Sequence, residues 1–251
     1  MAGAGTGADV MDGDEWRRHR PTSWTVFGES PALLASDALI VLALSMLVRE
    51  AGARGASAAG VLADAYQQLV VGQLMDIGFQ SRTSVTLAEC NRMVEGKTAA
   101  LTSCAAQMGA VLAGADSATV TALGEFGRHL GLAFQFTDDV LGIWGDPTLT
   151  GKPVGADIGT RKKSLPVAFA LSSPESVGSL TAFYQRSDEP DRDEIEQVTA
   201  RLEALGARSW AESRADLHYT AACDSLDRAG LAEQSQVALR ALARLAAKRV
   251  K

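Results

Sequence analysis

The sequence predicts an all-α fold, a bundle of many helices. Apolar residues recur at three- and four-residue spacing along most of the chain, the pattern of helices with one buried face. The alternating pattern of half-buried strands, bounded by turn signals, is absent from the sequence. Gly and Ala are abundant whereas aromatic residues make up only 6% of the 251 residues, a balance that favours closely packed helices. Functional sites in such bundles are built between facing helices.

The helical pattern follows a Gly-rich opening. The segment "MAGAGTGA", residues 1–8, has no apolar face and is predicted to be a flexible tail ahead of a single domain over 9–251. "GARGASAAG", "GADS" and "RSDEPDRDE" are predicted connectors, and Pro190 with Asp191 predicts a helix start. Helices are expected over residues 31–51, 58–78, 86–113, 116–144, 164–172, 175–186, 191–206, 208–229 and 231–250.

Net charge, cysteine spacing and the length of the apolar runs argue against a nucleic-acid-binding protein, a cysteine metal site and a membrane-spanning protein. The formal net charge of −6 argues against nucleic acid as the main partner, although a local basic pocket for phosphate remains compatible with it. Cys90, Cys104 and Cys223 lack metal-ligand spacing and indicate reduced thiols. The longest apolar run, residues 39–48, is too short for a transmembrane segment, and the N-terminus lacks a signal-peptide pattern. A cytoplasmic protein is expected.

Two adjacent carboxylates stand near the end of the longest helical pattern. Asp138 and Asp139 lie in "FQFTDDVLGIWGD", where apolar neighbours remove hydration and the two charges repel each other. The long loop that follows, residues 145–166, carries Lys152, Asp157, Arg161, Lys162 and Lys163. Magnesium binds through one or two carboxylates plus phosphate oxygens, and lysines neutralise the remaining phosphate charge. The segment therefore predicts a metal–phosphate site; the alternative is a solvated loop beside a charged helix surface.

A second cluster of the same kind lies in "ADVMDGDEWRRHRPTSW", residues 8–24. Asp9 and Asp12 would lie about 60° apart on a helix and share a face. Four cationic or titratable side chains follow them, at Arg17, Arg18, His19 and Arg20. A single charge run is most often a solvated surface, but two such clusters in an apolar helical chain favour a shared site.

These segments resemble the two aspartate-rich regions of the trans-isoprenyl diphosphate synthases, the polyprenyl synthetase family. The resemblance extends to "GQLMDIGF" at 72–79 and "GKTAALTSCAAQMGA" at 96–110, and it covers residue 9 to the C-terminus. The residues of these motifs are most similar to those of actinobacterial farnesyl and geranylgeranyl diphosphate synthases. The family implies an all-α bundle around a central cavity, usually dimeric. It also implies magnesium-dependent condensation of an allylic diphosphate with isopentenyl diphosphate.

The resemblance also assigns roles residue by residue. It implies metal ligands at Asp9, Asp12, Asp138 and Asp139. It implies contacts to the diphosphates or their metals at Arg17, Arg18, Lys97, Thr98, Gln135, Lys152 and Lys162. The candidate catalytic residues among these are Asp12, Lys97, Asp138 and Asp139. Gln73 and Asp76 match a further polar pair in the cavity.

The chemistry agrees with these roles. Ionising an allylic diphosphate requires stabilisation of the leaving group's charge by metal ions and preorganised cations, and it requires no nucleophilic side chain. The carbocation must be kept from water, so apolar cavity walls are expected over 99–112 and 123–143. His19, His129 and His218 are scattered along the chain and are interpreted as structural or surface residues.

The chain departs from the family pattern in three places. Ala8 stands where the first region has its leading aspartate, and Gly142 stands where the second has its last. Asp146 is the nearby candidate for that last carboxylate, but on a helix it would lie about 80° away from Asp138. The family's first helices, with a Gly-Lys-Arg motif that helps hold isopentenyl diphosphate, have no counterpart. The resemblance is therefore to an N-terminally truncated synthase.

Three functions remain open. The first is a prenyltransferase, acting as a homodimer, with activity reduced by these departures. The second is a terpene cyclase on the same fold, which would ionise the allylic diphosphate without isopentenyl diphosphate. The third is a non-catalytic subunit that forms a heterodimer with a complete synthase. Retention of the aspartates, Arg17, Arg18, Lys97 and Lys152 argues against a long-decayed remnant.

Overall fold

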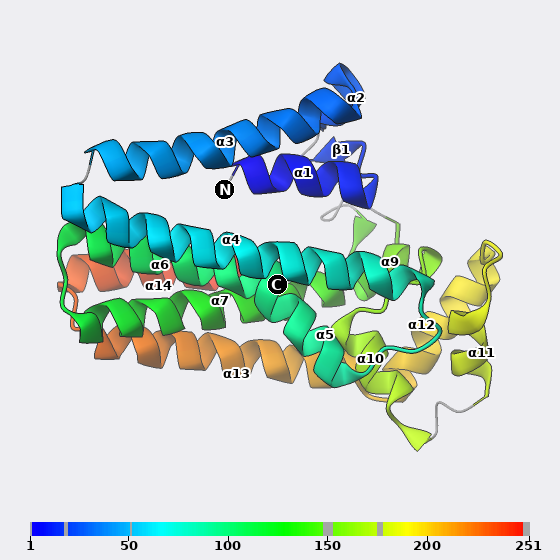
Figure 1. Cartoon of the computed structure of the whole chain (residues 1–251). Coiled ribbons are helices and arrows are strands. Elements are labelled where there is room, and N and C mark those ends of the chain that lie inside the picture. The colour runs from blue at the N-terminus through cyan, green and yellow to red at the C-terminus, as the bar shows by residue number, and fades with distance from the viewer. Residues whose placement is uncertain (1, 18–19, 51, 148–152, 175–177, 248–251) are drawn as a thin grey trace.

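The computed structural model describes residues 2–17, 20–50, 52–147, 153–174 and 178–247. These residues are predominantly helical, which confirms the predicted fold class (Figure 1). The N-terminal part contains α1 (Ala2–Asp12), β1 (Trp16–Arg17), β2 (Arg20–Pro21), α2 (Ser23–Phe27), α3 (Glu29–Glu50) and α4 (Gly52–Ser81). The central part contains α5 (Leu87–Val94), the π-helical turn η1 (Glu95–Ala99), α6 (Ala100–Ala113) and α7 (Ser117–Trp144). The C-terminal part contains α9 (Ala156–Gly159), α10 (Leu165–Leu171), α11 (Ser179–Gln185), α12 (Arg192–Ala204), α13 (Ala207–Arg228) and α14 (Glu233–Ala247).

The long helices lie side by side in layers (Figure 1). α3 is outermost, α4 follows it, α6 and α7 form the centre, and α13 with α14 covers the far side of α7. The short α1 lies between α3 and α4 at the end of the bundle where α2 is found. The short helices α9 to α12 gather at that same end.

Most of the predicted helices are confirmed, and their ends have identifiable caps. α12 begins after Asp191 as predicted, because Asp191 and Glu194 form a capping box. Asp116 caps α7 by accepting a hydrogen bond from the backbone N–H of Thr119. The expected helix over 86–113 consists of α5, η1 and α6 in direct succession, so its only irregularity is the π-helical turn.

Two expectations for the N-terminal third are wrong. Residues 2–8, expected as a flexible tail, belong to helix α1, where Gly7 packs against Ser36 of α3. Residues 52–60, expected as a connector, form the first turns of α4, and their small side chains at Gly55, Ala58 and Ala59 are buried. The Gly- and Ala-rich composition thus reflects close packing rather than a break. β1 and β2 pair antiparallel as a two-residue ladder that the sequence pattern does not reveal.

Helix α3 has an unusual composition for an outer helix. Residues Glu29–Arg49 have a mean hydropathy of 2.1 and are only 11% buried, so by length and composition this helix could cross a membrane. The predicted run over 39–48 is thus part of a longer apolar helix. A single helix of this kind is a weak indication of a membrane span.

Glycine brings the central helices into close contact. A Cβ on Gly127 of α7 would lie 2.3 Å from the carbonyl oxygen of Thr102 in α6. A Cβ on Gly131 would lie 2.2 Å from Oγ1 of the same threonine. Neither distance is sterically possible, so the spacing of α6 and α7 requires glycine at both positions. Thr98 of η1, one turn before Thr102, and Gln135 of α7, one turn after Gly131, are thereby brought within hydrogen-bond distance.

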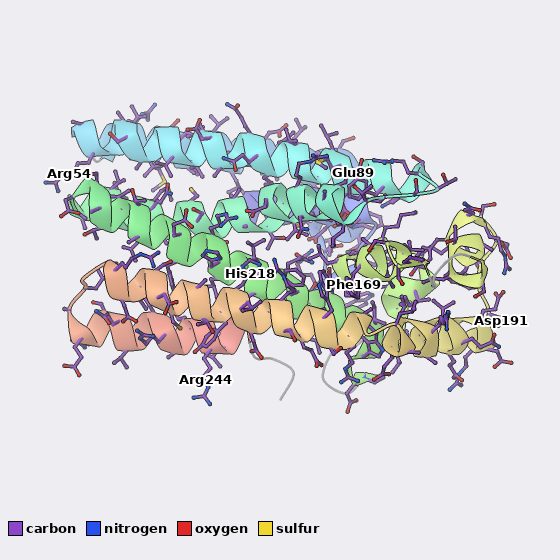
Figure 2. The ribbon with its side chains drawn as sticks, turned by 90° about the horizontal axis from the view of Figure 1, so that it is seen from below. Arg54, Glu89, Phe169, Asp191, His218 and Arg244 are labelled. Carbon is purple, nitrogen blue, oxygen red and sulfur yellow. The ribbon has the colours of Figure 1, made fainter. Side chains whose placement is uncertain are left out.

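His129 of α7 and His218 of α13 form a pair inside the bundle; Figure 2 shows His218 on the side of α13 that faces α7. Their Nδ1 atoms lie 3.0 Å apart, and His218 stacks on Phe136 with 5.7 Å between ring centroids. Burial, and after it the neighbouring His129, lower the pKa of His218 to about 4. Burial also lowers the pKa of His129. This position agrees with a structural role for both histidines; His19 lies outside the described residues.

We expect His218→Phe to reduce the loss of stability in acid. A histidine of the unfolded chain, with a pKa of 6.5, gains a proton between pH 6.5 and 4, whereas folded His218 stays neutral until about pH 4. Its contribution is therefore complete above pH 6.5 and is lost as the pH falls toward 4. Phenylalanine keeps the stacking on Phe136 and does not titrate.

Urea unfolding at pH 7 and pH 5 measures this effect. Because the two histidines are partly exposed, solvent reduces the effect of the pKa shift on stability. We therefore expect the free energy of unfolding to fall between pH 7 and pH 5 by about 1–2 kcal/mol more in the wild type than in the variant. Equal losses in both proteins would show that His218 does not remain neutral in the folded state.

Candidate active site

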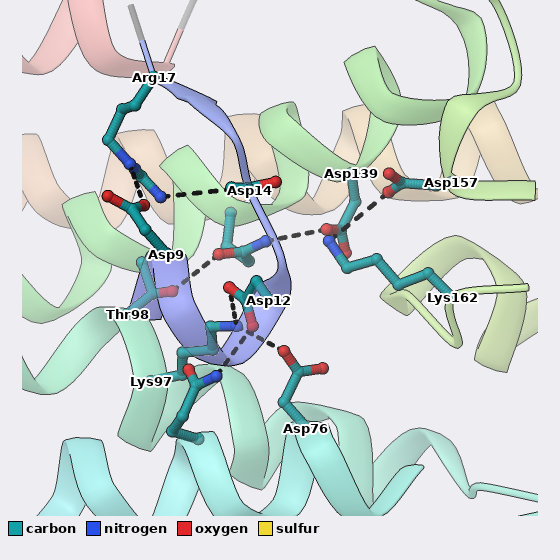
Figure 3. Close-up of polar contacts among 12 residues, drawn as sticks. Asp9, Asp12, Asp14, Arg17, Asp76, Lys97, Thr98, Asp139, Asp157 and Lys162 are labelled. Atoms are coloured by element: carbon teal, nitrogen blue, oxygen red, sulfur yellow. Dashed lines mark hydrogen bonds and ion pairs between the residues drawn. The ribbon is translucent and has the colours of Figure 1, made fainter. Parts of the chain in front are cut away.

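Lys97 is the centre of a polar group from three elements (Figure 3). Its Nζ lies 2.5 Å from Oδ2 of Asp76 on α4 and 3.4 Å from Oδ2 of Asp12 at the end of α1. Gln73 on α4 donates a hydrogen bond to Oδ1 of Asp12 over 2.9 Å. All four residues stand out in the sequence, and the structure brings them together.

The position of Lys97 is set by a contact between two backbones. A Cβ on Gly72 of α4 would lie 2.3 Å from the backbone nitrogen of Lys97, and a Cβ on Gly96 would lie 2.6 Å from the carbonyl oxygen of Gln68. α4 and η1 therefore touch directly, which only glycine permits. π-helical turns within helices are frequent at functional sites. Here the turn places Lys97 against the polar face of α4.

A chain of hydrogen bonds connects η1 to α7. Oγ1 of Thr98 donates to Oε1 of Gln135 over 2.7 Å, and Nε2 of Gln135 donates to Oδ1 of Asp139 over 2.8 Å. The backbone N–H of Leu165 donates to Oδ2 of Asp139 over 3.0 Å. Both oxygens of Asp139 are thus hydrogen-bonded, and the residue is only 2% exposed. Burial raises the pKa of Asp139 to about 6, although nearby Lys162 acts in the opposite direction.

The adjacent residue Asp138 has different surroundings. Asp138 is exposed, and among the described residues no group donates a hydrogen bond to it. The two neighbouring carboxylates relieve their repulsion by pointing apart, Asp139 inward and Asp138 outward. Asp138 is therefore the member of the pair that can reach a cation or ligand from outside, whereas Asp139 is held in place by protein donors.

Lys162 is the loop cation that faces these carboxylates. Its Nζ lies 3.6 Å from Oδ2 of Asp157, the residue on α9 five positions earlier. Loss of hydration lowers the pKa of Lys162, but Asp157 and Asp139 outweigh this and hold the pKa above its usual value. Asp138 and Asp76 act on Lys162 in the same direction. Carboxylates of α4, α7 and α9 thus act on one lysine.

The other cations of this loop are used elsewhere. Nε of Arg161 donates to the carbonyl oxygen of Phe183 over 2.9 Å, and Nζ of Lys163 donates to that of Phe79 over 3.0 Å. Both side chains therefore stabilise the fold around the loop. Lys152 lies outside the described residues.

Arg17 pairs with the other aspartate of the first cluster. Its Nε donates to Oδ1 of Asp9 over 2.5 Å, and its Nη2 lies 3.6 Å from Oδ2 of Asp14. Asp9 is only 5% exposed, and burial raises its pKa although Arg17 partly opposes the shift. Asp12 is thus the carboxylate of α1 that lies near Lys97, while Asp9 holds Arg17. Arg18 lies outside the described residues.

An apolar cavity of about 310 Å³ lies between α3, α4 and α6. Its lining includes Leu39, Met46, Leu62, Tyr66, Leu101 and Met108. Leu101, one helical turn after Lys97, is among its lining residues. The segment 99–112 therefore provides an apolar wall as predicted. The segment 123–143 instead contributes mainly to the buried core, with Leu123, Phe126, Leu132 and Phe136.

Residues 8–202 match the model of the polyprenyl synthetase family. The chain belongs to the polyprenyl synthetase family. The (2E,6E)-farnesyl diphosphate synthase of Mycobacterium tuberculosis is 43% identical over 239 residues, which are 94% of this chain and 67% of that protein. The geranylgeranyl diphosphate synthase of the same organism is 42% identical, over 87% of this chain and 63% of its own length. The chain spans about two thirds of the length of these relatives.

Solved structures give the same result. The polyprenyl synthetase of Streptomyces coelicolor A3(2) superposes with a TM-score of 0.87 at 39% identity, over 97% of this chain and 74% of that one. The geranylgeranyl pyrophosphate synthetase of Pyrococcus horikoshii superposes with a TM-score of 0.88 at 30% identity, over 98% and 75% of the two chains. The resemblance to actinobacterial synthases and the fold of this family are thus confirmed.

The two altered positions of this polyprenyl synthetase have distinct surroundings. Ala8 lies in α1 one turn before Asp12, so residues 8–12 are helical, and it lines a small apolar cavity together with Leu33 and Leu69. Gly142 lies in the last turns of α7, which ends at Trp144. Asp146 therefore follows the end of the helix and does not continue its face.

One residue of this region was not among the predicted site residues. The sequence pattern identifies Asp157 only as one charge of a long loop. The direction of its side chain depends on how that loop folds back on α7. The available signal was its spacing of five residues from Lys162, which alone does not distinguish a site residue from a solvated one.

Proposed function

We propose that this polyprenyl synthetase is a magnesium-dependent prenyltransferase that condenses an allylic diphosphate with isopentenyl diphosphate. The relatives named farnesyl and geranylgeranyl diphosphate synthases support this proposal. The observation that carries it is the pairing of cations with carboxylates from separate elements: Lys97 lies near Asp12 and Asp76, and Lys162 lies near Asp157 and under the influence of Asp138, Asp139 and Asp76. Such a site is suited to a ligand with a charged head.

The donors fit magnesium bound together with a diphosphate. Among the residues that the structure describes, no three His, Cys, Asp or Glu side chains are grouped to hold a metal ion by themselves. Magnesium is commonly bound through one or two carboxylates plus phosphate oxygens and water. We propose Asp12 and Asp138 as direct ligands, and Asp9 and Asp139 as members of the same regions that position their neighbours. Magnesium would supply Lewis-acid stabilisation of the leaving diphosphate.

The cations would neutralise the diphosphate groups. Lys97 pairs with Asp76, Lys162 lies near Asp157, and Arg17 of β1 pairs with Asp9 of the first aspartate cluster. Arg18 and Lys152 remain proposed contacts on the ground of the resemblance alone. Thr98 and Gln135 would orient the polar wall through their hydrogen bonds. Charge placed in advance at the leaving group is the main requirement for ionisation, because no nucleophile takes part.

Lys97→Met tests the role of the central lysine. We expect the variant to fold and to bind inorganic pyrophosphate with magnesium at least about tenfold more weakly, because a charge-assisted contact is lost. Isothermal titration calorimetry measures this affinity. Arg192→Met is the matched control, since it removes a cation that is paired with Glu196 on the exposed surface of α12. Equal affinity in Lys97→Met and wild type would remove Lys97 from the diphosphate site.

Incubation with magnesium, farnesyl diphosphate and isopentenyl diphosphate tests the whole proposal. A longer isoprenyl diphosphate is the expected product. Hydrocarbons or alcohols from the allylic substrate alone would instead show a terpene cyclase. Turnover that requires an added complete synthase would show a non-catalytic subunit.

We further propose a cytoplasmic homodimer. α3 and α4 expose many apolar side chains, including Leu34, Leu42, Met46, Val71 and Leu74. Contiguous apolar surface of this kind is typical of protein interfaces. Sedimentation analysis of the purified protein distinguishes a dimer from a monomer, and co-purification with a complete synthase would indicate a heterodimer instead.

A further inference from the structure

The carboxylate of Asp157 fills the space beside Gly142. A Cβ built on Gly142 would lie 2.4 Å from Oδ2, 2.6 Å from Cγ and 2.9 Å from Oδ1 of Asp157. These distances are far shorter than ordinary non-bonded contacts. The volume that a side chain on residue 142 would need is therefore occupied by a carboxylate from another part of the chain.

The backbone around Asp157 is anchored on α7. The N–H of Gly155 donates to the carbonyl oxygen of Ile143 over 3.0 Å, so the chain folds back onto the last turn of α7. Gly155 has a φ of 74°, a left-handed conformation that suits glycine. Ile158, which follows Asp157, is completely buried in the core. The position of Asp157 is thus fixed from both sides along the chain.

Asp157 also shares its charged surroundings with the aspartates of α7. Its side chain is only 14% exposed, and its Oδ2 lies 3.6 Å from Nζ of Lys162. Asp139 and Asp138 act on the same lysine, and Figure 3 shows Asp139 and Asp157 on either side of it. The three carboxylates therefore lie around one cation, although they come from two segments of the chain.

We propose that Asp157 provides the third carboxylate of the second aspartate region, in the place where a side chain at position 142 would lie. This inference rests on the proposed function and deepens it. Asp157 acts as a positioning residue, since it holds Lys162 beside Asp139 and contributes negative charge toward the cation that Asp138 binds. The motif around Asp138 then lacks its third aspartate in sequence, but the carboxylate of Asp157 occupies the corresponding place in the folded chain.

Moving the carboxylate back to residue 142 tests this inference. In Gly142→Asp/Asp157→Gly the clash is removed and the charge is retained, whereas Gly142→Ala/Asp157→Gly fills the same space without charge. Asp157→Asn keeps the shape of the side chain and removes its charge. Calorimetric titration of magnesium in the presence of inorganic pyrophosphate measures metal affinity without any turnover, and circular dichroism confirms folding.

We expect Asp157→Asn and Gly142→Ala/Asp157→Gly to bind magnesium about tenfold more weakly than wild type, as is typical when a residue that supports a metal ligand is lost. Gly142→Asp/Asp157→Gly should recover most of that loss. If Asp157→Asn binds magnesium as tightly as the wild type, the role of Asp157 is overturned and the proposed function stays intact. The same conclusion follows if Gly142→Asp/Asp157→Gly binds magnesium no more tightly than Gly142→Ala/Asp157→Gly. If the exchange variant does not fold, Asp157→Asn decides alone. Absence of metal-dependent pyrophosphate binding in the wild type would overturn both proposals.

Discussion

Asp138→Ala is expected to lower the rate of prenyl transfer about a thousandfold and to leave the helical circular dichroism unchanged. Asp138 is exposed, and among the described residues it accepts no hydrogen bond, so its removal leaves no buried group without a partner. The same exposure makes it the carboxylate of α7 that can bind a metal ion together with the substrate. Product formation from radiolabelled isopentenyl diphosphate at saturating magnesium measures the rate.

Asp224→Ala is the control for this substitution, because it removes an exposed aspartate from α13. Its rate should equal that of the wild type. Full activity of Asp138→Ala would mean that the metal–diphosphate site lies elsewhere in the chain.

Gly72→Ala is expected to lower the free energy of unfolding by about 2–3 kcal/mol. The added Cβ would lie 2.3 Å from the backbone nitrogen of Lys97 and 2.8 Å from the carbonyl carbon of Gly96. Backbone atoms cannot rotate away as side chains can, so α4 and η1 must separate. The higher helix propensity of alanine, worth at most about 1 kcal/mol, does not offset this cost. Urea unfolding at neutral pH measures the change.

Gly60→Ala provides a control with the opposite sign. Gly60 is exposed on the same helix, and no described atom lies within 4 Å of the position that the added methyl group would take. The substitution there should raise the free energy of unfolding by up to about 1 kcal/mol. If both substitutions stabilised the protein, α4 and η1 could not be in direct backbone contact.

The helical fold could be predicted because apolar periodicity records which face of each helix is buried. α7 and α12 follow that pattern closely. The same reasoning failed for residues 2–8 and 52–60, where glycine and alanine pack two helices together without leaving an apolar stripe. Small residues therefore gave the pattern of a flexible segment where the structure has a tight contact.

The candidate site was predictable in its composition but not in its geometry. Spacing indicated that Asp138 and Asp139 act together, but only the packing of α7 shows that one is exposed and the other is buried. Likewise, three consecutive cations follow Asp157 in the loop. Lys162 faces the carboxylates, whereas its two neighbours bond to backbone carbonyls elsewhere. The direction of a loop side chain depends on tertiary contacts that no local pattern records.

The histidine pair between α7 and α13 determines how its two rings carry their protons. Two neutral imidazoles whose Nδ1 atoms lie 3.0 Å apart can share a hydrogen bond only if one Nδ1 is protonated and the other is not. Nε2 of His129 lies 3.7 Å from a carboxylate oxygen of Glu125, which favours a proton on that nitrogen. His129 is then the Nε2–H tautomer, and His218 is the Nδ1–H tautomer. The interface between the two helices thus has a fixed donor and a fixed acceptor, although both residues are the same amino acid.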